Sequence, residues 1–365
     1  MNIERIILTH VRIPLEEPFT ISSGSVSEKD CIVVAVQSNG VTGYGEASPM
    51  SGPFYSDDTP ESTWTYLVDV LVPAVIKEQP PTIGQLNLLL DRLGGTPFAR
   101  AGIETAAWDL EARASGNHIS ALLGGGRSEI ESGLAVGIYP SIDILLKRIE
   151  VYLKEGYKRL KIKIQKGWDV VPLRAVRKSF GDVPLMVDAN CAYNRDDIEH
   201  LKRLDEFGLM MIEQPLKKDD LEGHAFLQKA IETPVCLDES ADDVRSVERA
   251  IELGSCKIVN IKIQRVGGLQ NARTIHDLCH ENGLPVWAGT MPELGIGGIH
   301  ALHLSTLPGF SYPTDVESSA RWFTDDIVSP RLRVNDGVFR IADYSSFDVD
   351  AEVIRKHKIR EQAFT

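Results

Sequence analysis

Five charged residues recur along this sequence at a nearly constant interval. Lys163, Asp188, Glu213, Asp238 and Lys262 are separated by 25, 25, 25 and 24 residues, and each comes at the C-terminal end of a predicted strand. One strand and one helix per step would bring all five side chains to the same rim of a barrel, where the active sites of barrel enzymes lie. Charges gathered there are costly to bury unless they compensate one another or hold an ion. The spacing therefore predicts a β/α barrel with a charged site at one rim.

The chain from about residue 133 supports this interpretation, because short apolar runs alternate there with amphipathic helical stretches. Such alternation is typical of βαβ units and a parallel sheet. Seven units in succession favour a closed barrel, and no GxGxxG follows the first strand to favour a dinucleotide-binding sheet. We therefore predict an α/β protein with a C-terminal (β/α)7β barrel resembling a TIM barrel. The predicted strands are Leu134–Ile138, Arg159–Ile164, Leu185–Asp188, Met210–Glu213, Val235–Asp238, Ile258–Ile261 and Pro285–Ala288.

Residues 1–125 are predicted to form an α+β capping domain. Ile3–Ile13 and Cys31–Gln37 have the composition of strands, and Ala99–Ser115 has the apolar spacing of a helix that ends at Gly116. We expect the barrel to occupy residues 126–322 and the segment 323–365 to return toward the capping domain. A chain of 365 residues suits one large barrel with a smaller companion domain.

Two loops of the capping domain could cover a site. The stretches Pro18–Gly24 and Pro49–Ser56 mix Gly or Ser with aromatic residues, among them Phe19 and Tyr55. We list both aromatics as candidate substrate contacts. Ordinary surface loops are an equally good interpretation of this composition.

Composition limits the class of function. The net charge is −13, with 52 acidic residues against 39 Lys and Arg, which argues against nucleic acid as a partner. The N-terminus has no signal-peptide pattern, and no apolar run approaches the roughly 20 residues that a membrane helix needs. Five cysteines without a CxxC pair indicate reduced thiols. We therefore expect a cytoplasmic enzyme that acts on a small molecule.

The three carboxylates in the repeat predict a metal site. Asp188, Glu213 and Asp238 would repel one another without a cation, and oxygen ligands with room for water or substrate suit Mg²⁺, with Mn²⁺ as the close substitute. No Cys or His accompanies them to indicate zinc. The alternative is that each carboxylate caps the helix that follows it. Capping explains one such position easily, but not three at the same place in successive repeats.

The two lysines that flank the carboxylates predict proton transfer. Lys161 shares a strand face with Lys163, and burial, repulsion and a nearby cation should all favour a neutral Lys163 that acts as a base. Lys262 would approach from the far side of the barrel, where Arg265 could hold or tune it. Alternatively, both lysines are structural partners of the carboxylates. If a metal is bound, it stabilises the enediolate that forms when a lysine removes the α-proton of a carboxylate substrate.

A few further residues are candidates for the same rim. Asn190 shares a face with Asp188, and Glu293 follows the seventh strand, so either could support the metal or the substrate. The pairs His276 with His280 and His300 with His303 have metal-like spacing, but we assign them to solvated faces of outer helices.

The motifs around these residues resemble a known family. They are Lys161-Ile162-Lys163, Val187-Asp188-Ala189-Asn190, Ile212-Glu213-Gln214-Pro215, Leu237-Asp238-Glu239-Ser240 and the run from Lys262 to Gly268. Together they resemble the enolase superfamily, and more narrowly its muconate-lactonizing subgroup. The stretch from Ala101 to Leu110 is also similar to the capping-domain helix of that family. The resemblance implies Mg²⁺ at the three carboxylates and, from family habit, a homo-oligomer.

Within the subgroup, the sequence is most similar to o-succinylbenzoate synthases and N-succinylamino acid racemases. The similarity lies in Lys163 to Asp169, in Pro53-Phe54-Tyr55-Ser56 and in Gly295-Ile296-Gly297. It implies that Lys163 is the base of the synthase reaction, and that Lys163 and Lys262 work on opposite faces in the racemase reaction.

Two alternatives stay open. A dipeptide epimerase or a muconate-type cycloisomerase would keep the same five charged residues, and the departures from the family pattern at Thr290, Pro292 and Gly298 leave the substrate undecided. A catalytically silent barrel that only binds belongs to a different class. Such a barrel would be expected to have lost a base or a ligand, and none is lost here.

Overall fold

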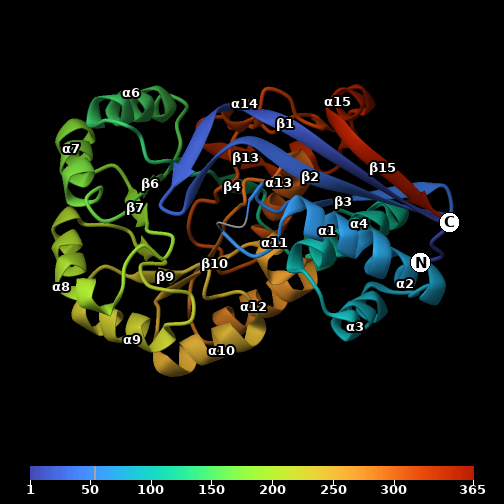
Figure 1. The fold of residues 1–365 in the computed structure, drawn as a ribbon, viewed down its shortest axis with the longest axis horizontal. Coiled ribbons are helices and arrows are strands. Elements are labelled where there is room, and N and C mark those ends of the chain that lie inside the picture. The colour runs from blue at the N-terminus through green and yellow to red at the C-terminus, as the bar shows by residue number, and fades with distance from the viewer. Residues whose placement is uncertain (53–54) are drawn as a thin grey trace.

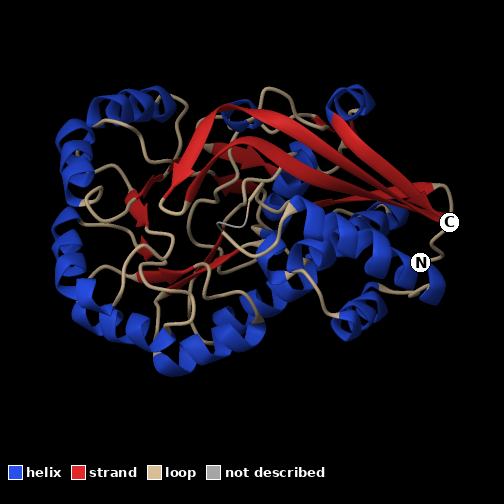
Figure 2. Cartoon of the chain, in the orientation of Figure 1, coloured by secondary structure: helices blue, strands red, loops and turns tan. Residues whose placement is uncertain are grey.

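The computed structural model describes residues 1–52 and 55–365, so Pro53 and Phe54 of the second predicted loop lie outside the described residues. Figure 1 shows a ring of helices around short strands on one side and a long twisted sheet with its own helices on the other. Figure 2 shows that the ring helices lie outside the strands. The predicted combination of a barrel with an α+β capping domain is confirmed.

The capping domain is built on a four-stranded antiparallel sheet in the order β15-β1-β2-β3. The last strand of the chain therefore lies beside the first (Figure 1). The strands are β1 (Arg5–Ile21), β2 (Gly24–Ser38), β3 (Val41–Ala47) and β15 (Lys358–Phe364). The helices are α1 (Pro60–Tyr66), α2 (Val72–Glu78), α3 (Ile83–Leu93), α4 (Pro97–Ser115) and α5 (Ile119–Leu123), with a π-helical turn at Leu67–Leu71.

Glycines let α4 pack directly on the sheet. A Cβ atom at Gly45 would lie 2.1 Å from the carbonyl oxygen of Gly102, and one at Gly43 would lie 2.4 Å from that of Ala106. The helix ends as predicted at Gly116, whose φ of +68° is left-handed. The backbones of β3 and α4 thus approach more closely than side chains would allow.

The predicted loop at Pro18–Gly24 is wrong. Strand β1 continues to Ile21, and Phe19 pairs with Val26 and Ile21 with Gly24, so the stretch forms the tip of a long hairpin. The register shifts between Pro14 and Phe19, where the sequence Leu-Glu-Glu-Pro hides the strand pattern because proline cannot donate to the ladder. Beyond this irregularity, Phe19 and the two residues after it pair with β2 again, so the strand continues to Ile21.

All seven predicted barrel strands are present, most of them slightly shorter than predicted. They form a parallel sheet in the order β11-β10-β9-β8-β7-β6-β5. Their bounds are β5 (Leu134–Val136), β6 (Leu160–Lys163), β7 (Leu185–Asp188), β8 (Ile212–Glu213), β9 (Val235–Leu237), β10 (Ile258–Ile261) and β11 (Val286–Ala288). The helices that follow these strands are α6 (Ile142–Leu153), α7 (Val170–Phe180), α8 (Ile198–Leu201), α9 (Leu221–Ala230), α10 (Val244–Leu253), α11 (Ile263–Val266), α12 (Leu269–Glu281) and, after β11, α13 (Gly295–Leu304), with 3₁₀ turns on both sides of α8.

The segment 310–315 closes the barrel. The amides of Ser311 and Asp315 donate to Val286 and Ala288 of β11, each at 3.0 Å. On its other side, the amide of Gly133, just before β5, donates to Thr314 at 2.8 Å. The segment thus takes the place of an eighth strand. Beyond it lie α14 (Ser319–Trp322), β12 (Val328–Ser329), β13 (Val338–Arg340), β14 (Asp348–Val349) and α15 (Ala351–His357), and β13 pairs with β4 (Glu129–Glu131).

Strand alternation builds the barrel interior in layers. Met186, Met211, Cys236 and Ile258 pack with Trp287 into a buried apolar cluster. Two residues further along β7 and β8 come Asp188 and Glu213, which share the inward face because alternate residues of a strand do. The charged rim therefore rests on an apolar floor.

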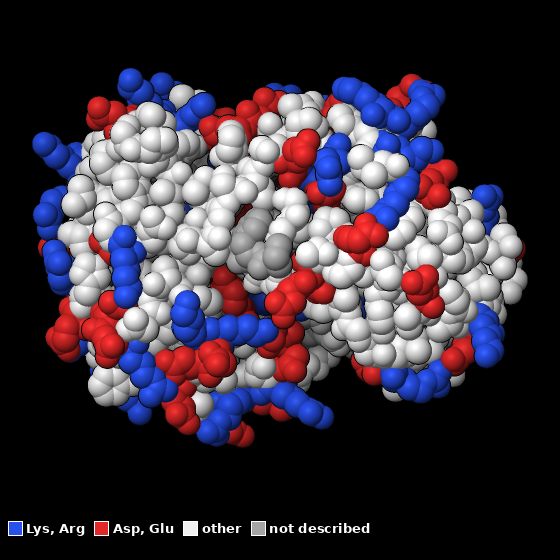
Figure 3. All heavy atoms as spheres, in the orientation of Figure 1, with Lys and Arg blue, Asp and Glu red and all other residues white. Residues whose placement is uncertain are grey.

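The structure also bears on the cysteines and on membrane-spanning helices. In the described part of the chain, the five cysteines are free, and no helix is long and apolar enough to cross a membrane. Figure 3 shows acidic and basic side chains interspersed over one face of the molecule.

Candidate active site

The three predicted metal ligands lie together at the C-terminal rim of the barrel. Asp188 and Glu213 end β7 and β8 and are paired across these strands, and Asp238 directly follows β9. All three are fully buried. One carboxylate oxygen from each lies within 4.8 Å of the others. Three anions at this separation need cations close by.

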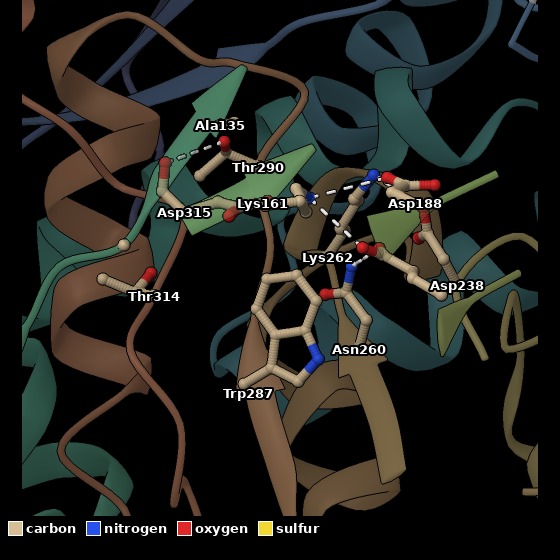
Figure 4. A network of polar contacts seen from close by, with 12 residues as sticks. Ala135, Lys161, Asp188, Asp238, Asn260, Lys262, Trp287, Thr290, Thr314 and Asp315 are labelled. Carbon is tan, nitrogen blue, oxygen red and sulfur yellow. Dashed lines mark hydrogen bonds and ion pairs between the residues drawn. The ribbon is translucent and has the colours of Figure 1, made fainter. Parts of the chain in front are cut away.

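Four cationic side chains surround this triad. Lys163 donates to Asp188 at 2.5 Å, and Lys262 donates to Asp238 at 2.9 Å. Lys161 contacts Glu213 at 3.3 Å and also bonds to Asp315, and Arg265 bonds to Asp238. Figure 4 shows Lys161 directed between Asp188 and Asp315, above the Trp287 ring. The lysines are thus ion-paired to the carboxylates in this structure, as in the structural alternative considered for the sequence.

The surroundings of the two candidate catalytic lysines shift their pKa values in opposite directions. Burial lowers the pKa of Lys163, and Lys161 adds to this effect while Asp188 opposes it. For Lys262, burial is outweighed by the nearby oxygens of Tyr55, Glu213 and Glu239, so its pKa is raised. The pKa of Lys161 is raised as well, because Asp315 and Glu213 outweigh burial. Lys163 is therefore the one of the three whose surroundings favour the neutral amine.

Two asparagines support the charged groups. Asn190 accepts from Lys163 at 3.0 Å and donates to Glu239 at 3.0 Å, so it links the lysine to a further buried carboxyl group. Burial, with Asp188 adding to it, raises the pKa of Glu239 to about 7. Asn260 donates to Glu213 at 2.7 Å from the next inward position below Lys262.

Phe19 and Tyr55, the two aromatic residues predicted as substrate contacts, belong to the capping domain. Phe19, at the tip of the β1–β2 hairpin, lies with its ring 5.9 Å from the ammonium of Lys163 and packs edge-on against Trp322. The hydroxyl of Tyr55 lies 3.3 Å from both Asp238 and the ammonium of Lys262. The capping domain thus places one aromatic side chain beside each lysine.

Glu293 lies in a different cluster. Its carboxyl group accepts from the amide of Met291 at 2.9 Å, and burial raises its pKa to about 7, although Lys29 acts in the opposite direction. Lys29 belongs to the capping domain and donates to the carbonyl of Ser48 at 3.0 Å. Within the described residues, no hydrogen bond or ion pair joins Glu293 to the triad.

Three neighbours of the site were missed in the sequence. Asp315 ends the segment 310–315, which has no apolar run to mark it as a strand. Glu239 directly follows Asp238 and lies beyond the end of β9, so the strand pattern does not predict that its side chain is buried. Asn260 could have been predicted from the sequence, because it stands two residues before Lys262 and alternate residues of a strand share a face.

The assignment of the histidine pairs to solvated faces is wrong for three of the four residues. His276, His300 and His303 are buried, whereas His280 is exposed. His300 and His303 lie on α13, all of whose residues are buried, because the capping domain and the C-terminal segment cover its outer face. An outer barrel helix is solvated only where nothing packs over it.

The chain matches two descriptions of protein families. Residues 3–124 match the mandelate racemase and muconate lactonizing enzyme N-terminal domain, and residues 145–345 match the enolase C-terminal domain-like family. An o-succinylbenzoate synthase of Geobacillus stearothermophilus is 44% identical over 98% of this chain and 96% of its own length. An N-succinylamino acid racemase of an Amycolatopsis species is 42% identical over 90% of both chains.

A solved structure agrees with these sequence matches. A member of the enolase superfamily from Listeria innocua superposes with a TM-score of 0.94 and 34% identity, over 100% of this chain and 99% of the other. The likeness therefore covers the capping domain and the barrel together.

Proposed function

The chain belongs to the enolase superfamily, and on this premise we propose that it removes the proton next to a substrate carboxylate, with Mg²⁺ at the triad and an enediolate as the intermediate. The observation that carries the proposal is the placement of Lys163 and Lys262. They end β6 and directly follow β10, with β7, β8 and β9 and the three carboxylates between them. Two amines on either side of a triad suit proton transfer at one carbon atom from two faces.

The donor set at the triad fits Mg²⁺. Asp188, Glu213 and Asp238 offer oxygen ligands only, and in the apolar cluster below them only Cys236 has a thiol that could compete. Mn²⁺ is the close substitute, since it accepts the same ligands. When bound, the ion would stabilise the negative charge that develops on the substrate carboxylate. Lys163 and Lys262 would then exchange their carboxylate partners for the substrate.

Lys163 is proposed as the base. It is buried, its pKa is lowered, and Asn190 holds its nitrogen through a hydrogen bond of 3.0 Å. Lys262 would act on the opposite face, either by returning a proton or by stabilising the anion as an ammonium. Lys161 and Arg265 would keep the carboxylates and their neighbours in place.

The substrate class is proposed from the relatives. We propose o-succinylbenzoate synthase activity, N-succinylamino acid racemase activity, or both, because the relatives that match nearly the whole chain carry these two names. Both kinds of substrate have a succinyl group and a carboxylate. Phe19 and Tyr55 beside the two lysines would supply apolar surface for the rest of the substrate.

Of the departures from the family pattern, Gly298 has a local explanation. A Cβ atom there would lie 2.5 Å from the Cδ1 atom of Leu332, in the C-terminal segment. The missing side chain thus makes room for Leu332. Because local packing explains the glycine, Gly298 is weaker evidence for a different substrate, such as that of a dipeptide epimerase or a cycloisomerase.

Parallel assays of purified enzyme with Mg²⁺ would test the substrate class. The substrates would be the o-succinylbenzoate precursor, a set of N-succinyl amino acids and a set of dipeptides. We expect kcat/KM to be highest for one of the succinyl compounds. Turnover of dipeptides alone would replace the proposed substrate class and leave the proton abstraction in place.

A further inference from the structure

The loop that follows Lys262 is held by the capping domain. The side-chain amide of Gln264 donates to the carbonyl of Glu46 at 2.7 Å and accepts from the amide of Ser48 at 3.0 Å. Arg100 of α4 donates to the carbonyl of Gly267 at 3.0 Å. These contacts begin two residues after Lys262, so they join the lysine to the capping domain through a short stretch of main chain.

Glu104 provides the strongest of these links. It is a fully buried residue of α4, and its carboxylate accepts from the amides of Leu269 at 2.7 Å and Gln270 at 2.9 Å. These amides open α12, where main-chain N–H groups have no partner within the helix. Trp108, one turn further along α4, donates to the same carboxylate at 2.8 Å and fixes its orientation. A residue of one domain thus caps a helix of the other.

The local sequence is adapted to this contact. Gly268 has a φ of +128°, and a Cβ atom there would lie 2.5 Å from Oε2 of Glu104. Only glycine combines this backbone with so close an approach. Gly268 therefore allows the carboxylate to reach the start of α12.

Lys163 is held in another way. Its side-chain partners, Asp188 and Asn190, belong to the barrel. The capping domain contacts this pair at the hairpin tip, where the hydroxyl of Ser22 donates to the carbonyls of Ala189 at 3.1 Å and Asn190 at 3.3 Å, and not through Glu104 or α12. Within residues 1–52 and 55–365, no hydrogen bond joins the capping domain to residues 163–170. The two lysines on either side of the triad thus differ in what positions them.

We propose that Glu104 is a positioning residue for Lys262. By capping α12 and fixing the 262–268 loop, it sets the place of the Lys262 ammonium relative to the triad, while Lys163 keeps its place without it. The inference rests on the proposed function, in which the two lysines exchange protons on opposite faces of one carbon atom. It predicts that loss of Glu104 impairs one face of the reaction.

Glu104→Gln is the variant that tests this inference. Glutamine keeps the size of the side chain, but its amide group would face the N–H of Leu269 or of Gln270, so one donor loses its acceptor. Asp109→Asn is the matched control. Asp109 is a buried carboxylate on the same helix, and it bonds to the amide of Tyr44 at 2.8 Å and to Arg113, not to the Lys262 loop.

The measurement is α-proton exchange of each enantiomer of an N-succinyl amino acid in D₂O with Mg²⁺. Exchange by the Lys163→Ala and Lys262→Ala variants identifies which enantiomer presents its proton to which lysine. For Glu104→Gln we expect exchange on the Lys262 face to fall roughly ten- to a hundredfold, while the Lys163 face changes by about twofold or less. Asp109→Asn should not separate the two faces.

Equal losses on both faces in Glu104→Gln would overturn the inference, because a general loss of structure would act on both. A crystal structure of the same variant tests the positioning without any substrate. We expect the Lys262 ammonium to be displaced from Asp238 and Lys163 to stay in place; an undisplaced Lys262 would overturn the inference. Absence of exchange in the unmodified enzyme would instead count against the proposed function, and the crystal structure would still decide the role of Glu104.

Discussion

Lys161 and Asp315 form a buried ion pair across the line along which the barrel closes. Lys161 extends from β6, and Asp315 ends the segment 310–315 that completes the barrel between β11 and β5. Arg159 contacts the same carboxylate at 2.8 Å. All three side chains are almost fully buried. Asp315 is therefore shared by two buried cations, of which Lys161 also contacts Glu213 at 3.3 Å.

Replacement of Asp315 should destabilise the barrel strongly. In Asp315→Asn the two cations Lys161 and Arg159 would face each other without their shared anion, and removal of one partner of a buried pair costs roughly 3–5 kcal/mol. Urea denaturation would measure the free energy of unfolding. Glu206→Gln is the control, because the ion pair of Glu206 with Arg174 is exposed and should contribute less than about 1 kcal/mol. Similar losses in the two variants would contradict this account of the closure.

The contact of β3 with α4 should not tolerate a side chain. In Gly45→Ala, the new Cβ atom would meet backbone atoms of Gly102 and Ala106, which cannot rotate away. We expect a loss of roughly 1–3 kcal/mol or more in the free energy of unfolding. Gly126→Ala is the matched variant, since a Cβ atom there has nothing within 4 Å. Equal stability of the two variants, measured by urea denaturation, would show that α4 can move away from the sheet.

The pH dependence of the reaction should report Lys163. The base must be neutral to take a proton, so kcat/KM should rise with pH through a midpoint below the ordinary lysine pKa of 10.5, because burial and Lys161 lower the pKa of Lys163. Lys161→Gln removes the cation that contributes to this shift, and its midpoint should lie at higher pH. A midpoint that stays the same or falls in that variant would mean that Lys161 does not influence the base.

Mg²⁺ binding should depend on the triad and not on other carboxylates near the rim. We expect Asp188→Ala to weaken Mg²⁺ binding measured by calorimetry by at least about tenfold, because it removes one of three charged ligands. Glu293→Gln serves as the control, since Glu293 is a buried carboxyl group that lies with Lys29 apart from the triad. Unchanged affinity in Asp188→Ala would place the metal elsewhere.

Much of the barrel could be predicted from the sequence, because the chain has a nearly regular repeat. A charged residue at the end of each of several strands fixes both the strand ends and the rim at which Lys163, Asp188 and Lys262 meet. The strand period of two then explains the apolar floor below them. Local pattern and global fold agree in this part of the chain.

The remaining features depend on contacts between distant segments. Asp315 lies in a segment whose pairing is set by its neighbours and not by its own apolar pattern. Glu104 looks in sequence like any acidic residue of a helix, and only the docked domains show that it caps α12. The burial of His300 follows in the same way from elements that pack over α13. No spacing within the chain carries this information.

The central claim is that Lys163 removes a proton next to a carboxylate with the help of Mg²⁺. The most direct measurement is proton NMR of an N-succinyl amino acid and of the o-succinylbenzoate precursor in D₂O, with the unmodified enzyme, with EDTA added, and with Lys163→Ala. The account predicts that only the unmodified enzyme forms o-succinylbenzoate or exchanges the α-proton of the enantiomer that faces Lys163. It predicts that Lys163→Ala stays folded and still binds Mg²⁺. Undiminished turnover by that variant, or by the enzyme in EDTA, would contradict the account.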